Sequence, residues 1–299
     1  MCSEGRIIKI KNLEYNELPK IRLPYDTTRY EKLTGLVREE NLSTVCQEAN
    51  CPNIFNCFSK GTLTFMILGN ICTRNCSYCS VKTGKPFAPN KTEPSKIAGI
   101  IKKLKLDYVV ITCVTRDDLS DGGANVFAET VREIKNKNPN CKIELLISDL
   151  NGNWEALKKI IAANSQVIGH NIEVVKRLFP TLRPQGSYER SIKLLKNLKK
   201  YNSKIITKSG FMIGLGEKDK EIIQTMKGIK SADCDIITIG QYLAPNVKHV
   251  PIKKFYSAEE FSFLKEVGES LGFKCVESAA LVRSSFNANS SYKKVREKI

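Results

Sequence analysis

Six of the eleven cysteines in this chain form two closely spaced groups of three. The first triplet is Cys46, Cys51 and Cys57, and the second triplet is Cys72, Cys76 and Cys79. Three thiolates can hold a cubane iron–sulfur cluster while its fourth iron stays without a cysteine ligand. An iron with an open coordination position can take part in chemistry, so the two triplets indicate a reactive site rather than a structural clip.

The second triplet has the spacing C-x3-C-x2-C, which is short enough for one loop to surround a single cluster. Cys76 and Cys79 could alternatively belong to a zinc knuckle. Zinc usually takes four ligands from paired C-x2-C elements, and the chain has no second C-x2-C pair. The spacing therefore favours an iron–sulfur cluster over zinc.

The bulk composition is that of a globular protein. The chain has 299 residues, of which 41% are hydrophobic and 26% charged, enough for one large domain or two modest ones. Its first segment is charged throughout and shows no secretory signal, and no window approaches the roughly 20 apolar residues that span a bilayer. Clustered cysteines in such a chain predict reduced, metal-binding thiols, a cytoplasmic location and no membrane insertion. A mature organellar form is the alternative.

The charge balance is strongly basic, with 48 Lys and Arg against 31 Asp and Glu, a formal net charge of +17. Such a field attracts nucleic acids, acidic proteins or phosphorylated ligands. The lysines are scattered along the chain and form no basic arm, so a bias spread over solvated helix faces explains the charge equally well. Charge alone does not select a partner.

Strand and helix patterns alternate along the chain. Helical spacing of apolar residues predicts helices around 97–104, 126–134, 192–198 and 261–271, the last ending at Gly272. Apolar strand-like runs occur at 62–68, 108–114, 143–147, 166–169, 205–213 and 235–239. Alternation of this kind predicts a parallel sheet, and about six units fit an open, partial (β/α)6 TIM-like barrel of the α/β class.

The barrel places reactive groups at the carboxyl ends of its strands. The second triplet follows the first predicted strand, where Gly69 and Asn70 end the apolar run, so it lies at the expected edge. We expect three parts: an N-terminal extension (1–60) with the first triplet, the partial barrel (61–275), and a C-terminal tail (276–299).

The second triplet, with Tyr78 before its last cysteine, resembles the cluster loop of the radical S-adenosylmethionine superfamily. The resemblance implies that the open iron binds the amino and carboxylate groups of S-adenosylmethionine. Electron transfer from the cluster then cleaves the sulfonium and yields a 5′-deoxyadenosyl radical. In such enzymes the cofactor performs the difficult step. The protein binds and orients the reactants and excludes side reactions.

The wider sequence resembles the lipoyl synthase family from about residue 40 to about residue 290. The matching segments, in unbroken order, are CQEANCPNIFNC (46–57), GTLTFM (61–66), the second triplet, RDDLSDGGA (116–124), HNIE (170–173), TKSGFMIGLGE (207–217), GQYL (240–243) and VRSS (282–285). The family attaches two sulfur atoms, at C6 and C8, to an octanoyl chain already linked to a lysine of a carrier domain, and uses two S-adenosylmethionine molecules per product.

The resemblance implies a role for each cysteine triplet and for one serine. Cys72, Cys76 and Cys79 would hold the four-iron, four-sulfur cluster that reduces S-adenosylmethionine. Cys46, Cys51 and Cys57 would hold an auxiliary cluster that supplies sulfur, and Ser285 would cap its fourth iron as a ligand with a catalytic role. The chain departs from the family at Phe286, where a tyrosine is usual, and at Asn70, where an aspartate is common.

Cofactor contacts are expected from Asn171, Glu173 and Arg183. Arg183 could pair with the methionyl carboxylate as a bidentate donor, or be an ordinary surface arginine. His170 could contact the cofactor or be a core histidine with both ring nitrogens bonded. The run from Gly214 to Glu217 could approach an adenine or form a strand-to-helix turn. Five cysteines are isolated, and most of them are expected to be buried free thiols: Cys2, Cys113, Cys141, Cys234 and Cys275.

The resemblance also implies partners. These are octanoylated carrier domains (the acyltransferase subunits of 2-oxoacid dehydrogenases and the glycine cleavage H protein) and an electron donor such as a flavodoxin or ferredoxin, with no DNA. An alternative enzyme is a methylthiotransferase acting on tRNA, which also has two cysteine triplets. In that family the first cysteines spread over a separate domain and a nucleic-acid module follows the barrel, whereas the tail here is short. A zinc-stabilised RNA-binding module is the non-enzymatic alternative.

Overall fold

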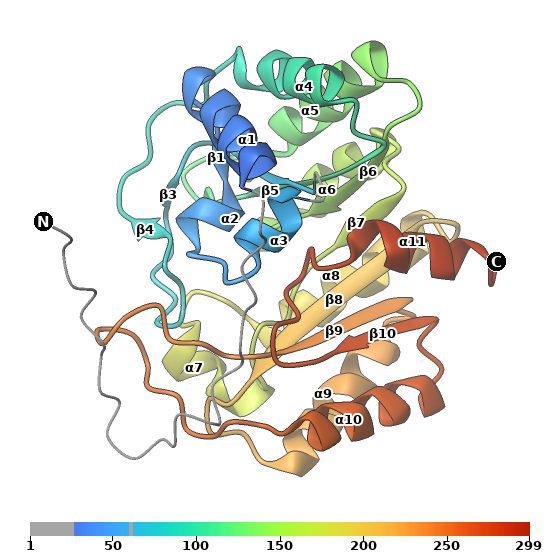
Figure 1. Ribbon diagram of the computed structural model, residues 1–299. Helices are drawn as coiled ribbons and strands as arrows, with labels where there is room; N and C mark the ends of the chain where they lie inside the picture. The colour runs from blue at the N-terminus through green and yellow to red at the C-terminus, as the bar shows by residue number, and fades with distance from the viewer. Residues whose placement is uncertain (1–26, 60–61) are drawn as a thin grey trace, which may run out of the picture.

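A computed structural model of the protein places residues 27–59 and 62–299. Its centre is an eight-stranded sheet with the order β1-β2-β5-β6-β7-β8-β9-β10 (Figure 1). β1 pairs antiparallel to β2, and every other neighbouring pair is parallel. The strands are β1 (Ser43–Thr44), β2 (Thr64–Ile67), β5 (Tyr108–Cys113), β6 (Lys142–Leu146), β7 (Val167–Gly169), β8 (Ile206–Ile213), β9 (Ile236–Gln241) and β10 (Cys275–Ser278).

The open, partial barrel predicted from the sequence is confirmed. Each of the six apolar runs overlaps one parallel strand, and β1 and β10 form the two edges of the sheet within the described residues. The sequence pattern missed these two edge strands. β1 has only two residues, and the second half of β10 is polar and only partly buried.

Helices connect successive parallel strands and cover the outside of the sheet (Figure 1). They are α4 (Glu93–Leu104), α5 (Ala124–Lys137), α6 (Trp154–Ala162), α8 (Tyr188–Tyr201), α9 (Asp219–Lys230) and α10 (Ala258–Ser270). On α4 the residues Ile97, Ile100 and Ile101 face the main core, as the helical spacing predicts. Gly272, predicted to end the last of these helices, has a left-handed φ of +86° just beyond α10.

The remaining elements complete the described part of the molecule. They are α1 (Thr28–Glu39), α2 (Val45–Glu48), α3 (Ile54–Ser59), the paired strands β3 (Ile71–Cys72) and β4 (Lys82–Thr83), the 3-10 turns Leu150–Gly152 and Lys176–Leu178, α7 (Phe179–Leu182) and α11 (Ala288–Arg296). Within residues 27–59 and 62–299, no helix is long and apolar enough to cross a membrane.

Helix α11 packs against the inner face of the curved sheet, near the amino ends of the strands (Figure 1). Val295 of α11 joins a buried cluster with residues of β7, β8, β9 and β10, and Ala288 joins one with Tyr108 and Val110 of β5. The rings of Tyr108 and Tyr292 lie 5.7 Å apart. The helix therefore closes the interior of the partial barrel at this end.

Beyond α11, towards the carboxyl ends of the strands, lies a buried ion pair. Lys208 Nζ of β8 is 2.8 Å from Glu144 Oε1 of β6, with both side chains 3% exposed, and Tyr108 donates a hydrogen bond of 2.6 Å to Glu144 Oε2. On the strand between them lies Gly169, where a Cβ would make a tight contact of 3.2 Å with the Lys208 carbonyl oxygen. Side chains of one strand alternate between faces, so Ile206 contacts α11, Lys208 forms the ion pair, and Gly210 and Met212 reach the space beyond.

Removing one partner of the buried pair should destabilise the protein strongly. Lys208→Met leaves the Glu144 carboxylate buried without its cation, which costs about 3–5 kcal/mol of unfolding free energy. Anaerobic denaturant unfolding measures the loss. The control is Lys200→Met on the exposed surface of α8, where we expect a change within about 0.5 kcal/mol. Equal effects in the two variants would show that the ion pair contributes nothing specific.

Candidate functional site

One cavity of about 340 Å³ lies at the carboxyl ends of the parallel strands. Thr112 of β5, Leu146 of β6, Met212 of β8 and Gly240 of β9 contribute to its wall. All ten residues that the sequence proposes for the site line it: Cys46, Cys51, Cys57, Cys72, Cys76, Cys79, Asn171, Glu173, Arg183 and Ser285. The structure therefore brings both triplets, the expected cofactor contacts and the distant serine into one space.

The cysteines surround this space rather than converge on one point. Across the part of the chain that the structure describes, no group of three His, Cys, Asp or Glu side chains is arranged to hold a single metal ion. A four-iron cluster is bound at separate corners, so it requires thiols that stand around a volume.

The loop of the second triplet is held at several points. It begins at β3 and returns at β4, where Gly84 N–H donates to the Cys72 carbonyl at 3.0 Å. Its backbone is also bonded to the segment after β5, to α7 and to the 244–250 loop. These bonds run from Thr73 N–H to Thr115 O (3.1 Å), from Ser77 N–H to Leu182 O (3.0 Å), and from His249 Nε2 to Cys79 O (3.0 Å).

The first triplet lies on short helices beside the sheet. Cys46 is in α2, whose first turn is capped by the Thr44 hydroxyl, and Cys57 is in α3. Cys51 lies between these helices, and its N–H donates to the Cys46 carbonyl at 3.0 Å. The buried Asn53 donates from Nδ2 to the Leu281 carbonyl at 2.6 Å. This bond ties the first triplet to the segment that carries Ser285.

The segment 279–286 crosses the carboxyl end of β9 at very short range. A Cβ on Gly240 would lie 2.2 Å from the Val282 carbonyl oxygen, so only glycine permits this approach. Val282, Arg283, Ser284 and Ser285 all line the cavity, and Asn171 Nδ2 donates to the Ser284 hydroxyl. The sequence motif VRSS marked this segment, but it indicated no role for Arg283 or Ser284.

The thiols are largely withdrawn from water. Burial raises the pKa of Cys46 and of Cys79 to about 12, and it also raises the pKa of Cys51 and Cys76. Without bound iron these four thiols are therefore neutral near pH 7. Thiols bind metal as thiolates and release their protons, so a donor set of buried and half-buried cysteines around one cavity fits an iron–sulfur cluster.

Two arginines give the thiols their positive surroundings. Arg183 lowers the pKa of Cys76, and Arg283 lowers that of Cys51, in each case against the larger effect of burial. Both arginines line the cavity, one on the side of each triplet. Each triplet thus has a fixed cation that favours the thiolate form.

Asn171, Glu173 and Arg183 form a connected group after β7. Arg183 Nη1 donates to the carbonyls of Asn171 (3.0 Å) and Ile172 (3.3 Å), and Asn171 Nδ2 donates to Glu173 Oε1 at 3.0 Å. Glu173 has a left-handed φ of +71°, which is unusual for a residue other than glycine and is often found at functional sites. Burial raises its pKa, while Arg183 and Asn171 oppose that shift. A half-buried carboxylate and a buried guanidinium that line one cavity suit a ligand with both an amino and a carboxylate group.

The structure resolves the alternatives for His170 and for the run after β8. His170 is buried in the core, with Nδ1 2.9 Å from the Ile147 carbonyl and Nε2 2.9 Å from the Ser191 hydroxyl, so it is a core histidine. Glu217 accepts hydrogen bonds from the N–H groups of Gly214 (2.6 Å) and Leu215 (2.9 Å), which makes this run a strand-to-helix turn.

The isolated cysteines divide into two groups. Cys141, Cys234 and Cys275 are buried thiols, as expected. Cys113, at the end of β5, is half-buried and lines the cavity, which the sequence did not indicate. Cys2 lies outside the described residues.

The environment of His170 predicts a pH dependence of stability. Burial lowers its pKa to about 4, whereas an unfolded histidine titrates near pH 6.5. As the pH falls, the unfolded chain therefore binds a proton at His170 before the folded protein does. The free energy of unfolding decreases between about pH 6.5 and pH 4, by up to about 3 kcal/mol. Denaturant unfolding at several pH values should show a shallower slope for His170→Gln than for the parent. Identical slopes would contradict this account.

Comparison with known proteins gives three consistent results. The family model of the Radical SAM superfamily matches residues 66–229. The chain is 51% identical over 263 residues to the lipoyl synthase of Caldicellulosiruptor saccharolyticus, covering 88% of this chain and 92% of that one. It is 48% identical over 269 residues to the mitochondrial lipoyl synthase of Nematostella vectensis, covering 90% and 92%. The crystal structure of methylornithine synthase superposes with a TM-score of 0.56 at 16% identity, over 74% of this chain and 72% of that one, which shows a shared fold.

Proposed function

The chain belongs to the lipoyl synthase family of the radical S-adenosylmethionine superfamily, and from this premise we propose that its two cysteine triplets hold two iron–sulfur clusters with different tasks. The enzyme uses S-adenosylmethionine and four-iron, four-sulfur chemistry to insert sulfur at C6 and C8 of an octanoyl group. The observation that supports the division of tasks is that both triplets and Ser285 line one cavity.

We assign the second triplet and the group after β7 to S-adenosylmethionine. Cys72, Cys76 and Cys79 would hold the cluster, which together with S-adenosylmethionine would supply the radical that abstracts hydrogen from the octanoyl chain. Glu173 would accept hydrogen bonds from the amino group of S-adenosylmethionine, and Arg183 would bind its carboxylate. Asn171 orients Glu173 through their 3.0 Å bond.

We assign the first triplet and Ser285 to the auxiliary cluster that provides sulfur. Cys46, Cys51 and Cys57 would bind three irons, and the Ser285 oxygen would bind the fourth. A serine oxygen is a poorer match to iron than a thiolate, so Ser285 would hold the cluster's most weakly bound iron. Phe286 also lines the cavity and keeps the local turn, with its N–H 2.9 Å from the Arg283 carbonyl, but it lacks the hydroxyl of the family's tyrosine.

The same assignment divides the chain into an extension (1–60), a barrel (61–275) and a tail (276–299). Two contacts support a tail that belongs to the auxiliary site: the bond from Asn53 to Leu281 and the close approach of Val282 to Gly240. The boundary falls within β10 (Cys275–Ser278), so the tail leaves directly from the sheet.

We propose an octanoylated carrier domain as the substrate, namely an acyltransferase subunit of a 2-oxoacid dehydrogenase or the glycine cleavage H protein. The net charge of +17 favours an acidic carrier. A flavodoxin or ferredoxin would supply electrons. Clustered thiols that must stay reduced favour a cytoplasmic location. The relatives from Caldicellulosiruptor saccharolyticus and Nematostella vectensis are lipoyl synthases, which gives no support to the tRNA methylthiotransferase or to the zinc-stabilised RNA-binding module.

The two triplets should be separable by variants. Replacing Cys72, Cys76 and Cys79 with alanine should remove about half of the roughly eight irons expected for two clusters and abolish 5′-deoxyadenosine formation. Replacing Cys46, Cys51 and Cys57 should remove the other half and leave 5′-deoxyadenosine formation in place, without lipoyl product. Iron and sulfide analysis after anaerobic reconstitution, with product analysis, checks both. Zinc without labile sulfide in the parent would refute the proposal.

Ser285→Ala should separate cluster binding from sulfur insertion. We expect near-parental iron and sulfide, because three thiols remain, and a loss of roughly tenfold or more in conversion of an octanoyl-lysyl peptide. Ser290→Ala, a serine five residues away, is the matched control and should convert the peptide at the parental rate. Unchanged conversion by Ser285→Ala would remove this residue from the mechanism.

A further inference from the structure

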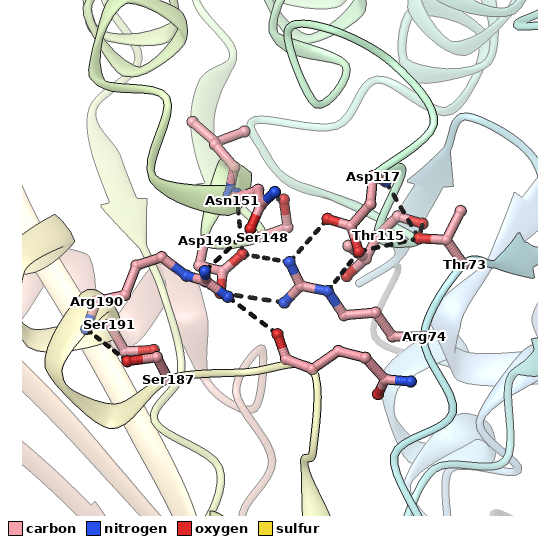
Figure 2. Close-up of polar contacts among 12 residues, drawn as sticks. Thr73, Arg74, Thr115, Asp117, Ser148, Asp149, Asn151, Ser187, Arg190 and Ser191 are labelled. Carbon is pink, nitrogen blue, oxygen red and sulfur yellow. Dashed lines mark hydrogen bonds and ion pairs between the residues drawn. The ribbon is translucent and has the colours of Figure 1, made fainter.

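Arg74 lies inside the loop of the second triplet, between Cys72 and Cys76, and is 4% exposed. Its guanidinium makes two bidentate ion pairs (Figure 2). Nε and Nη2 donate to the carboxylate of Asp117 at 2.7 and 2.8 Å. Nη2 and Nη1 donate to the carboxylate of Asp149 at 2.7 and 3.0 Å. The side chain therefore bridges two carboxylates in a fixed plane.

The two carboxylates come from neighbouring strand ends. Asp117 follows β5, and its N–H bonds the hydroxyl of Thr73 at 3.1 Å. Asp149 follows β6, is fully buried, and accepts the N–H of Asn151 at 3.1 Å. On the other side of Asp149, Arg190 of α8 donates from Nε at 2.8 Å (Figure 2). We call Arg74, Asp117, Asp149 and Arg190 the Arg74 clamp.

The charges of the Arg74 clamp balance, with two guanidinium groups and two carboxylates. Burying an arginine is tolerated when its charge is paired and its donors are bonded in good geometry. The clamp therefore fixes the loop without adding net charge beside the cluster. Lysine could not replace the arginine, because an ammonium group lacks the planar fork that satisfies two carboxylates at once.

The backbone of Arg74 is in direct contact with Cys72 of the second triplet. Its N–H lies 3.4 Å from Cys72 Sγ, and its carbonyl accepts the Thr83 hydroxyl at 3.1 Å. A movement of the Arg74 side chain is thus transmitted to the loop within two residues of a cluster ligand. Reactions that depend on alignment lose rate steeply with small displacements of the reacting groups.

We propose that Arg74 is a positioning residue, which through the Arg74 clamp sets where the cluster of the second triplet stands relative to the ends of β5 and β6, and so aligns S-adenosylmethionine with the substrate. The inference rests on the proposed assignment of Cys72, Cys76 and Cys79 to that cluster. Arg74 acts through these cysteines and does not itself touch the reacting atoms.

Arg74→Lys tests the proposal in the anaerobically reconstituted enzyme. We expect iron and sulfide at the parental level. The S-adenosylmethionine concentration that half-saturates the change in the cluster's electron paramagnetic resonance spectrum should rise about tenfold or more. The ratio of 5′-deoxyadenosine formed to sulfur inserted should also rise, because a misaligned radical is lost to side reactions.

Arg116→Lys is the matched control. Arg116 is equally buried and makes a bidentate pair with Asp118 at 2.8 and 2.8 Å, but its other bonds go to the carbonyls of Leu68 and Phe87 rather than to the cluster loop. Arg116→Lys should lower the melting temperature as Arg74→Lys does. It should keep the parental spectrum, the parental half-saturating S-adenosylmethionine concentration and the parental product ratio. A purely structural role for Arg74 would make the two variants alike.

Parental half-saturation and product ratio in Arg74→Lys, or the same shifts in Arg116→Lys, would overturn the proposal. If Arg74→Lys loses its cluster, Asp117→Asn serves instead, since this partner is 30% exposed and its replacement removes one arm of the clamp. A smaller rise in half-saturation supports the proposal, and no rise overturns it. A parent spectrum that does not respond to S-adenosylmethionine would instead refute the proposed function.

Discussion

Parallel pairing from β2 to β10 is the constraint on which the rest of the structure depends, because it places the carboxyl ends of seven strands at one rim. Because side chains alternate between the two faces of a strand, every second residue of a strand lies at a different level of the interior. On β8, Ile206 contacts α11, Lys208 pairs with Glu144, and Gly210 and Met212 reach the cavity. Along this single strand, the contact with α11 comes first, the buried ion pair second and the cavity third.

The electrostatics of the cavity depend on which groups pair with its arginines. Arg74 is neutralised by Asp117 and Asp149, so it anchors the loop mechanically. Arg183 and Arg283 instead bond mainly to carbonyl oxygens and direct their charge towards the thiols of the second and first triplet. Burial raises the pKa of the thiols, and these two cations oppose that rise at Cys51 and Cys76. The two triplets thus have equivalent thiols but different neighbours.

Local patterns in the sequence predicted what depends on neighbouring residues. Strands buried on both faces read as apolar runs, and the spacing of Cys72, Cys76 and Cys79 indicated a cluster loop without any fold. Contacts between distant segments could not be read in this way. The partners of Arg74 lie 43 and 75 residues away, and the fit of Gly240 against Val282 requires both segments in place. His170 stayed ambiguous because Ile147 and Ser191, which bond its ring, are distant in sequence.

The bond between Asn53 and the Leu281 carbonyl spans 228 residues and has a consequence for the order of events during synthesis. At ribosomal rates of about 5–20 residues per second, residue 285 follows residue 57 by roughly 10 to 45 seconds. Throughout that interval the nascent chain carries Cys46, Cys51 and Cys57 without the wall that encloses them. Contacts of such long range also form late in folding. The segment that carries Ser285 therefore closes the cavity last, after the three thiols of the first triplet have been exposed to the cytosol during synthesis.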